Sequence, residues 1–202
     1  MRSTSLRILI VLSILAVAAG WSYLRSAGTG ADMIEAARAY LAALSDEQKA
    51  TTAMPFDTPQ RVGWHFIPKD ERKGLQIKNM NDSQREAAFR LLRSVLSEIG
   101  YGKATTIMQM ESLLKELQKG RSGVAIRDPE RYYYTVFGQP SETGRWGLSI
   151  EGHHLSLNFV VDGGQVVAST PTFFAANPTI VCQPSPGGPA PGTRVLANEE
   201  LL

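Results

Sequence analysis

The chain has 202 residues, of which 43% are hydrophobic, and this length and composition suit a single globular domain. Its 21 basic and 19 acidic residues give a formal net charge of +2. The chain has no basic run, so it lacks the positive patch that binds nucleic acid. Cys182 is the only cysteine, so an internal disulfide and a thiolate cluster for zinc or for iron and sulfur are excluded.

The amino terminus has the layout of an export signal. A basic start precedes a largely apolar run over residues 8–19, as in a secretory signal peptide or a short signal anchor. Small residues near the end of this run favour cleavage, whereas Trp21 and Tyr23 suit a membrane interface and favour an uncleaved anchor. Both alternatives assign residues 1–24 to export. They predict a periplasmic, extracellular or membrane-tethered protein that meets the membrane only through this segment.

The first half of the remaining chain predicts helices. One helix should begin near Asp32, and a second, shorter one should be capped by Ser45. A longer helix should follow Asn81, which can cap its start, and should end at Gly100. A tight Gly-Tyr-Gly link then leads into a further helix that should stop at Gly120. These last two helices predict an antiparallel helical hairpin.

A short alternating pattern lies before the hairpin. Apolar Val62, Trp64 and Phe66 alternate with residues that include Arg61 and His65. The alternation predicts a strand that carries His65 on its less apolar face. This strand would put an imidazole beside the Arg61 guanidinium.

The second half of the chain predicts strands. Alternating patterns cover residues 132–137, 146–150, 154–161 and 165–169. Asp162 and Gly163 predict a two-residue hairpin turn between the last two strands. We therefore expect an α+β domain over residues 31–180, in which N-terminal helices, including the antiparallel hairpin, precede an antiparallel β-meander.

Residues 146–159 read W-G-L-S-I-E-G-H-H-L-S-L-N-F and place two adjacent histidines within an alternating pattern. Strand alternation sets His153 on the apolar face, with Leu155, and His154 on the polar face, with Asn158. The two rings should therefore diverge unless the strand is bulged at Gly152, which argues against one metal ion bound by both.

Two interpretations of these residues stay open. In the catalytic interpretation, His154 is a metal ligand or general base, His65 or Glu151 assists, and Arg61 or Arg145 holds an anionic group. His154 and His65 are then the candidate ligands of a divalent metal. The sequence contains no H-x-H, H-E-x-x-H or cysteine pair, so a metal would need ligands that the fold brings together.

The non-catalytic interpretation, which we favour for this chain, gives the histidines a structural role. A histidine on an apolar face is more often a satisfied core residue than a ligand. His154, with serine and asparagine alongside, suits a hydrogen-bonded network as well as acid and base chemistry. A small-molecule ligand is compatible with both interpretations. Its candidate contacts are Arg61, Trp64, Arg145, Trp146, His153, Asn158 and Asn177.

The composition of the last part of the chain disfavours regular secondary structure. Residues 181–193 are rich in proline and glycine and predict a linker. Residues 194–202 predict the start of a helix capped by Asn198, and the chain stops within its first turn. We therefore expect a truncated helix at this end.

Four stretches together resemble a known family. They read W-G-L-S-I-E-G-H-H-L-S-L-N-F, P-T-F-F-A-A-N-P over residues 171–178, F-D-T-P-Q-R-V-G-W-H-F-I-P over residues 56–68, and Y-T-V-F-G-Q-P-S over residues 134–141. In this order they resemble the uncharacterised, mostly bacterial family known as domain of unknown function 3500. The resemblance covers nearly all of the chain after the export signal.

The resemblance has several implications. It implies that His65, the two adjacent histidines and Asn177 belong to the family pattern, from which the chain departs at Leu148 and Ala175. It also implies that the chain is the N-terminal half of a longer domain, whose missing C-terminal half or a partner chain would complete a site. The activity of the family is not established. We therefore expect an exported, non-catalytic envelope domain, with a histidine-centred metal-binding or hydrolase-like enzyme as the alternative.

Overall fold

The computed structural model describes residues 30–120, 122–184 and 189–196. The expected export segment lies outside these residues, as does most of the expected terminal helix. Within them, no helix is both long enough and apolar enough to cross a bilayer.

The described chain forms four helices and a seven-stranded sheet, so the expected α+β fold is confirmed. The helices cover residues 30–43, α2 (Asp46–Thr52), α3 (Asp82–Ser94) and α4 (Glu98–Leu117). Short 3₁₀ turns cover η1 (Pro59–Arg61), η2 (Ile77–Asn79) and η3 (Val124–Ile126). The strands are β1 (Ala53–Met54), β2 (Leu75–Gln76), β3 (Tyr133–Phe137), β4 (Trp146–Gly152), β5 (Leu155–Asp162), β6 (Gln165–Ala168) and β7 (Thr172–Phe174).

The sheet is mostly antiparallel. Its main order is β1-β3-β4-β5-β6, while β2 pairs with β3 and β7 pairs with β5. Only the short β1 runs parallel to its neighbour among the described strands. The turn between β5 and β6 consists of Gly163 and Gly164, both with positive φ, and so lies one residue later than the sequence predicted.

Two helix starts agree with the sequence. Ser45 caps α2 and Asn81 caps α3, and in both cases a glutamine three residues later completes a capping box. The two capping glutamines, Gln48 and Gln84, also hydrogen-bond to each other at 2.8 Å and 3.0 Å, which connects the starts of the two helices.

The expected link at Gly100 is wrong. Helix α3 ends at Ser94, and α4 begins after Ser97, so Gly100 and Gly102 lie inside α4. Ser97 is the N-cap, and its hydroxyl accepts a hydrogen bond of 3.1 Å from the Gly100 amide. This cap and the packing of Ala104, Ile107 and Met108 into the core offset the low helix propensity of the two glycines.

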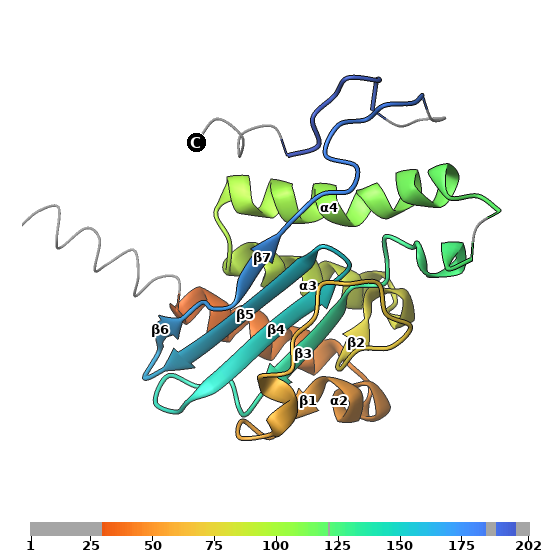
Figure 1. The fold of residues 1–202 in the computed structure, drawn as a ribbon. Helices are drawn as coiled ribbons and strands as arrows, with labels where there is room; N and C mark the ends of the chain where they lie inside the picture. The colour runs from red at the N-terminus through yellow and green to blue at the C-terminus, as the bar shows by residue number, and fades with distance from the viewer. Residues whose placement is uncertain (1–29, 121, 185–188, 197–202) are drawn as a thin grey trace, which may run out of the picture.

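The expected strand at residues 62–66 is also absent. After η1 the chain has no regular structure until β2, because β1 and β2 already occupy the available positions beside β3. The segment over residues 55–74 instead crosses the front of the sheet in Figure 1. We call it the crossing segment.

The helix over residues 30–43 and α3 lie behind the sheet, on the face opposite the crossing segment (Figure 1). The helix-side core contains alternate strand residues, including Tyr134, Val136, Leu148, Ile150, Leu155 and Leu157, all at most 1% exposed. The helix over residues 30–43 and α3 supply the other half of this core. This confirms the apolar face predicted for β5.

Glycine at position 152 permits a close approach between β4 and Tyr132. A methyl group there would lie 2.2 Å from Tyr132 Cδ1, and the Tyr132 ring is fully buried. We expect Gly152→Ala to lower the free energy of unfolding by about 1–3 kcal/mol, because the ring has no space into which it can move. Gly102→Ala is the control, because a methyl group there meets no atom within 4 Å. It should raise stability by about 0.5–1 kcal/mol through helix propensity. Urea denaturation measures both, and equal effects would contradict the packing argument.

Candidate functional site

The sheet face that carries the crossing segment is polar and buried. Thr135, Ser149 and Asn158 form one row across β3, β4 and β5, and each is at most 9% exposed. Ser149 Oγ donates to Asn158 Oδ1 at 3.0 Å, and Asn158 Nδ2 donates to the Pro171 carbonyl at 2.9 Å. Buried polar groups need such partners. The row is therefore a hydrogen-bonded surface beneath the crossing segment.

A buried ion pair fastens the crossing segment to this face. Lys73 Nζ lies 2.8 Å from Glu151 Oε1, and the two side chains are only 7% and 4% exposed. Lys73 also donates to the Gly63 carbonyl at 2.7 Å. The predicted candidate Glu151 is therefore neutralised within the protein.

Two depressions open between the crossing segment and the sheet. The first has a volume of about 150 Å³ and brings together three predicted ligand contacts, Arg61, Trp64 and Asn158. The second, of about 480 Å³, is lined by both His65 and Glu151. These groupings unite residues that lie up to about a hundred positions apart in the sequence.

The two adjacent histidines do not lie in a strand, as the sequence predicted. Strand β4 ends at Gly152 and β5 begins at Leu155, so His153 and His154 form the two-residue turn between them. His154 has a φ of 60°, which is uncommon for a residue with a side chain. The rings do not diverge: their centroids lie 4.0 Å apart in an edge-to-face arrangement.

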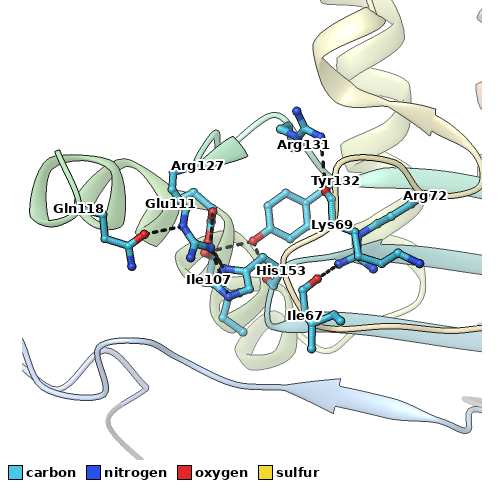
Figure 2. Close-up of polar contacts among 10 residues, drawn as sticks. All are labelled: Ile67, Lys69, Arg72, Ile107, Glu111, Gln118, Arg127, Arg131, Tyr132 and His153. Carbon is cyan, nitrogen blue, oxygen red and sulfur yellow. Dashed lines mark hydrogen bonds and ion pairs between the residues drawn. The ribbon is translucent and has the colours of Figure 1, made fainter. Parts of the chain in front are cut away.

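His153 belongs to a buried charged cluster (Figure 2). Its Nδ1 contacts Glu111 Oε1, a short hydrogen bond between helix α4 and the β4–β5 turn. Arg127 Nη1 lies 3.0 Å from the same His153 nitrogen and 3.6 Å from Glu111 Oε2. Arg127 Nε in turn donates to Gln118 at 3.0 Å. The Glu111 carboxylate is thus shared between an imidazole and a guanidinium.

Tyr132 completes this cluster, as Figure 2 shows. Its hydroxyl donates to the His153 carbonyl at 2.9 Å. Burial raises the pKa of Tyr132 well above its ordinary value, and the Glu111 charge adds to this effect. The cavity beside it, which Arg72 and Arg131 also line, has a volume of about 10 Å³. This volume suits about one water molecule.

His154 differs from its neighbour because its ring has no polar partner. Its Nδ1 is buried and forms no hydrogen bond within the described chain. Burial lowers the pKa of His154 to about 4, and the adjacent His153 and Arg127 contribute to this shift. The His154 imidazole is therefore neutral at physiological pH.

The remaining predicted contacts lie elsewhere. Arg145 is paired with Asp162, with its Nη2 2.5 Å from Oδ2. Trp146 is fully buried in the helix-side core, and Asn177 is exposed beyond β7. The structure does not bring these three residues to either depression.

Sequence reasoning missed three buried charged residues. Glu111 interrupts the apolar stripe of α4, and this carboxylate between inward-facing residues was the available signal. Arg127 and Lys73 carried no local signal, because their partners are 16 and 78 residues away.

A family model described as Protein of unknown function (DUF3500) matches residues 26–202, which is nearly the whole chain. The chain belongs to this family. The match confirms the resemblance seen in the four sequence stretches. No curated protein and no solved structure matches the chain significantly.

No metal centre is assembled in the described part of this DUF3500 chain. No three histidine, cysteine or acidic side chains there are grouped so that they could hold a metal ion. His65 and His154, the candidate metal ligands, therefore have no third ligand among these residues.

The lowered pKa of His154 makes stability depend on pH. The unfolded chain binds a proton at this residue near pH 6.5, and the folded chain does so only near pH 4. The unfolded state holds more protons between these values, so the stability contributed by neutral His154 is complete above about pH 6.5 and is lost as pH falls toward 4. His154→Asn is the matched variant, because asparagine tolerates positive φ and does not titrate. We expect the variant to lose less stability than the wild type between about pH 7 and 4 in urea denaturation. Parallel pH profiles would contradict this assignment.

Proposed function

We propose that this DUF3500 chain is an exported, non-catalytic domain of the cell envelope that binds a small ligand over the polar face of its sheet. The main support is that both buried carboxylates near the histidine turn are held by partners within the protein. Glu111 is shared by His153 and Arg127, and Glu151 is paired with Lys73. The two depressions between the crossing segment and the sheet are then the places where a ligand would bind.

The contacts of the two histidines also favour a structural role. In the described chain neither ring is hydrogen-bonded to a serine, threonine or cysteine side chain, so neither activates a nucleophile there. His153 is instead held by Glu111, and its carbonyl accepts from Tyr132. Such contacts fix the end of the β4–β5 hairpin against α4.

The export part of the proposal rests on the sequence. The basic start and apolar run over residues 8–19 are typical of an export signal. The single cysteine cannot form an internal disulfide, so the fold does not rely on one outside the cell. A further domain half or partner chain that completes the ligand site remains part of this proposal.

A double-mutant cycle tests the structural role of the cluster. Glu111→Ala should lower the free energy of unfolding by about 3 kcal/mol, because it leaves both His153 and the buried Arg127 without their carboxylate, and His153→Ala by about 1–3 kcal/mol, because Glu111 keeps Arg127. The double mutant should lose at least about 1 kcal/mol less than the sum. Arg93 and Glu98 form an exposed pair at 2.6 Å and serve as the control cycle. Its coupling should stay below about 0.5 kcal/mol. Additive losses at Glu111 and His153 would contradict the proposed role.

A histidine-centred metal-binding or hydrolase-like enzyme is the second candidate. The observation that favours it is His154, whose neutral ring has an unpartnered buried nitrogen and whose backbone is held at an uncommon φ. In this reading a partner chain or further domain half supplies the remaining ligands.

Elemental analysis of this chain, purified together with any partner chain bound to it and beside a longer family member, separates the two candidates. If the chain is non-catalytic, the purified protein should contain less than about 0.1 equivalents of zinc, manganese or iron. His154→Ala should then leave that value unchanged. Stoichiometric metal that disappears in His154→Ala would support the enzyme and contradict the main proposal, and its loss in His65→Ala as well would add His65 to the ligands.

A further inference from the structure

Arg61 stands in the smaller depression with its positive charge unpaired. Its Nε donates to the Phe56 carbonyl at 2.7 Å, and its guanidinium carbon lies 4.3 Å from the centroid of the Phe56 ring. These two contacts fix the group and leave its two terminal nitrogens without a partner among the described residues. Arg145, the other arginine considered for an anion, is neutralised by Asp162. Only Arg61 of these two is thus available to a ligand.

The walls of this depression are mainly apolar. Trp64, Phe137, Val160 and Pro171 line it, while Asn158 and Thr170 add polar atoms. Its volume of about 150 Å³ is close to that of a cavity that holds one benzene ring. Apolar walls with a few fixed polar groups are typical of small-molecule sites.

The charge of the depression selects the kind of anion. A guanidinium has two parallel N–H donors, and the two oxygens of a planar carboxylate can accept from both at once in a bidentate pair. Among the residues that line the depression, Arg61 is the only charged one. One positive charge balances a monocarboxylate, whereas a phosphate dianion would need a second cation.

We infer that the depression binds a monocarboxylate carried on a single ring. The carboxylate pairs with Arg61, and the ring lies against Trp64 and Pro171. This inference deepens the proposed ligand-binding function and rests on it, since it names the chemical class of the ligand.

A titration of the purified protein with sodium benzoate, followed by ¹⁵N NMR, tests the inference. Benzoate should shift the Trp64 indole signal with a Kd of about millimolar, as expected for so small a ligand. The buried Trp146 indole serves as an internal reference. Benzyl alcohol lacks the charge and acetate lacks the ring, so each should bind at least about tenfold more weakly.

Two matched arginine variants locate the site. Arg61→Gln should weaken benzoate binding at least about tenfold, because it removes the paired cation. Arg145→Gln makes the same change in net charge at an arginine outside the depression, and it should leave the Kd unchanged. Trp64→Leu removes the indole reporter, so binding to this variant is followed through the side-chain amide signal of Asn158, which also lines the depression. It should also weaken binding, which provides a second test should Arg61→Gln disturb the crossing segment.

Three outcomes overturn the inference. In the first, benzyl alcohol binds as tightly as benzoate. In the second, Arg145→Gln weakens benzoate binding as much as Arg61→Gln does. In the third, benzoate leaves the Trp64 signal unshifted. If neutral ring compounds shift Trp64 and benzoate does not, the ligand class is wrong while ligand binding stands. The Glu111 and His153 cycle and the metal analysis do not depend on this titration, so their failure would identify the proposed function as the error.

Discussion

The rest of the domain depends on the two-residue turn between β4 and β5. Helix α4 reaches it through the short contact of Glu111 with His153. The crossing segment reaches it through the Phe66 carbonyl, which accepts from the His154 amide at 2.9 Å. The chain after β7 reaches it through the Ala175 amide, which donates to the His154 carbonyl at 2.9 Å. One turn therefore joins the helix layer, the sheet and the segment on its other face.

Buried charge explains why these layers meet in one arrangement. An isolated charge in a protein interior costs several kcal/mol, so each buried carboxylate must lie against its own cation or donor. Glu111 of α4 lies against Arg127 and His153. Glu151 of β4 lies against Lys73 of the crossing segment. Both pairs act at the same end of β4, because Glu151 and His153 are two residues apart. Among the described residues that line the smaller depression, Arg61 is the only charged one, so no buried ion pair closes the sheet face there.

The sequence predicted the parts of the fold that follow from local periodicity, and missed those that depend on distant partners. Alternation in β5 separated Leu155 and Leu157 from Ser156 and Asn158, and the structure confirms these two faces. The histidine turn was missed because neither residue is a usual turn former, and the positive φ of His154 is sustained by contacts with residues 66 and 175. Of the candidate site, the residue types were recognised, but their grouping was not. Arg61 and Asn158 come together only because the crossing segment folds over the sheet.

The way the crossing segment is held explains how it can form a binding surface. Its apolar residues are only partly buried: Val62 is 70% exposed and Ile67 48%, while the Phe66 ring stacks on Phe173 with the ring centroids 4.3 Å apart. Directional contacts also hold the segment: Arg72 donates to the carbonyls of His65 and Ile67, and Lys73 donates to that of Gly63. Contacts of this kind fix the backbone at defined atoms without filling the space above the sheet with side chains. A segment with few buried apolar contacts also opens at a lower free energy than the core. The proposed ligand would therefore enter between the segment and the sheet, and the core behind the sheet would stay closed.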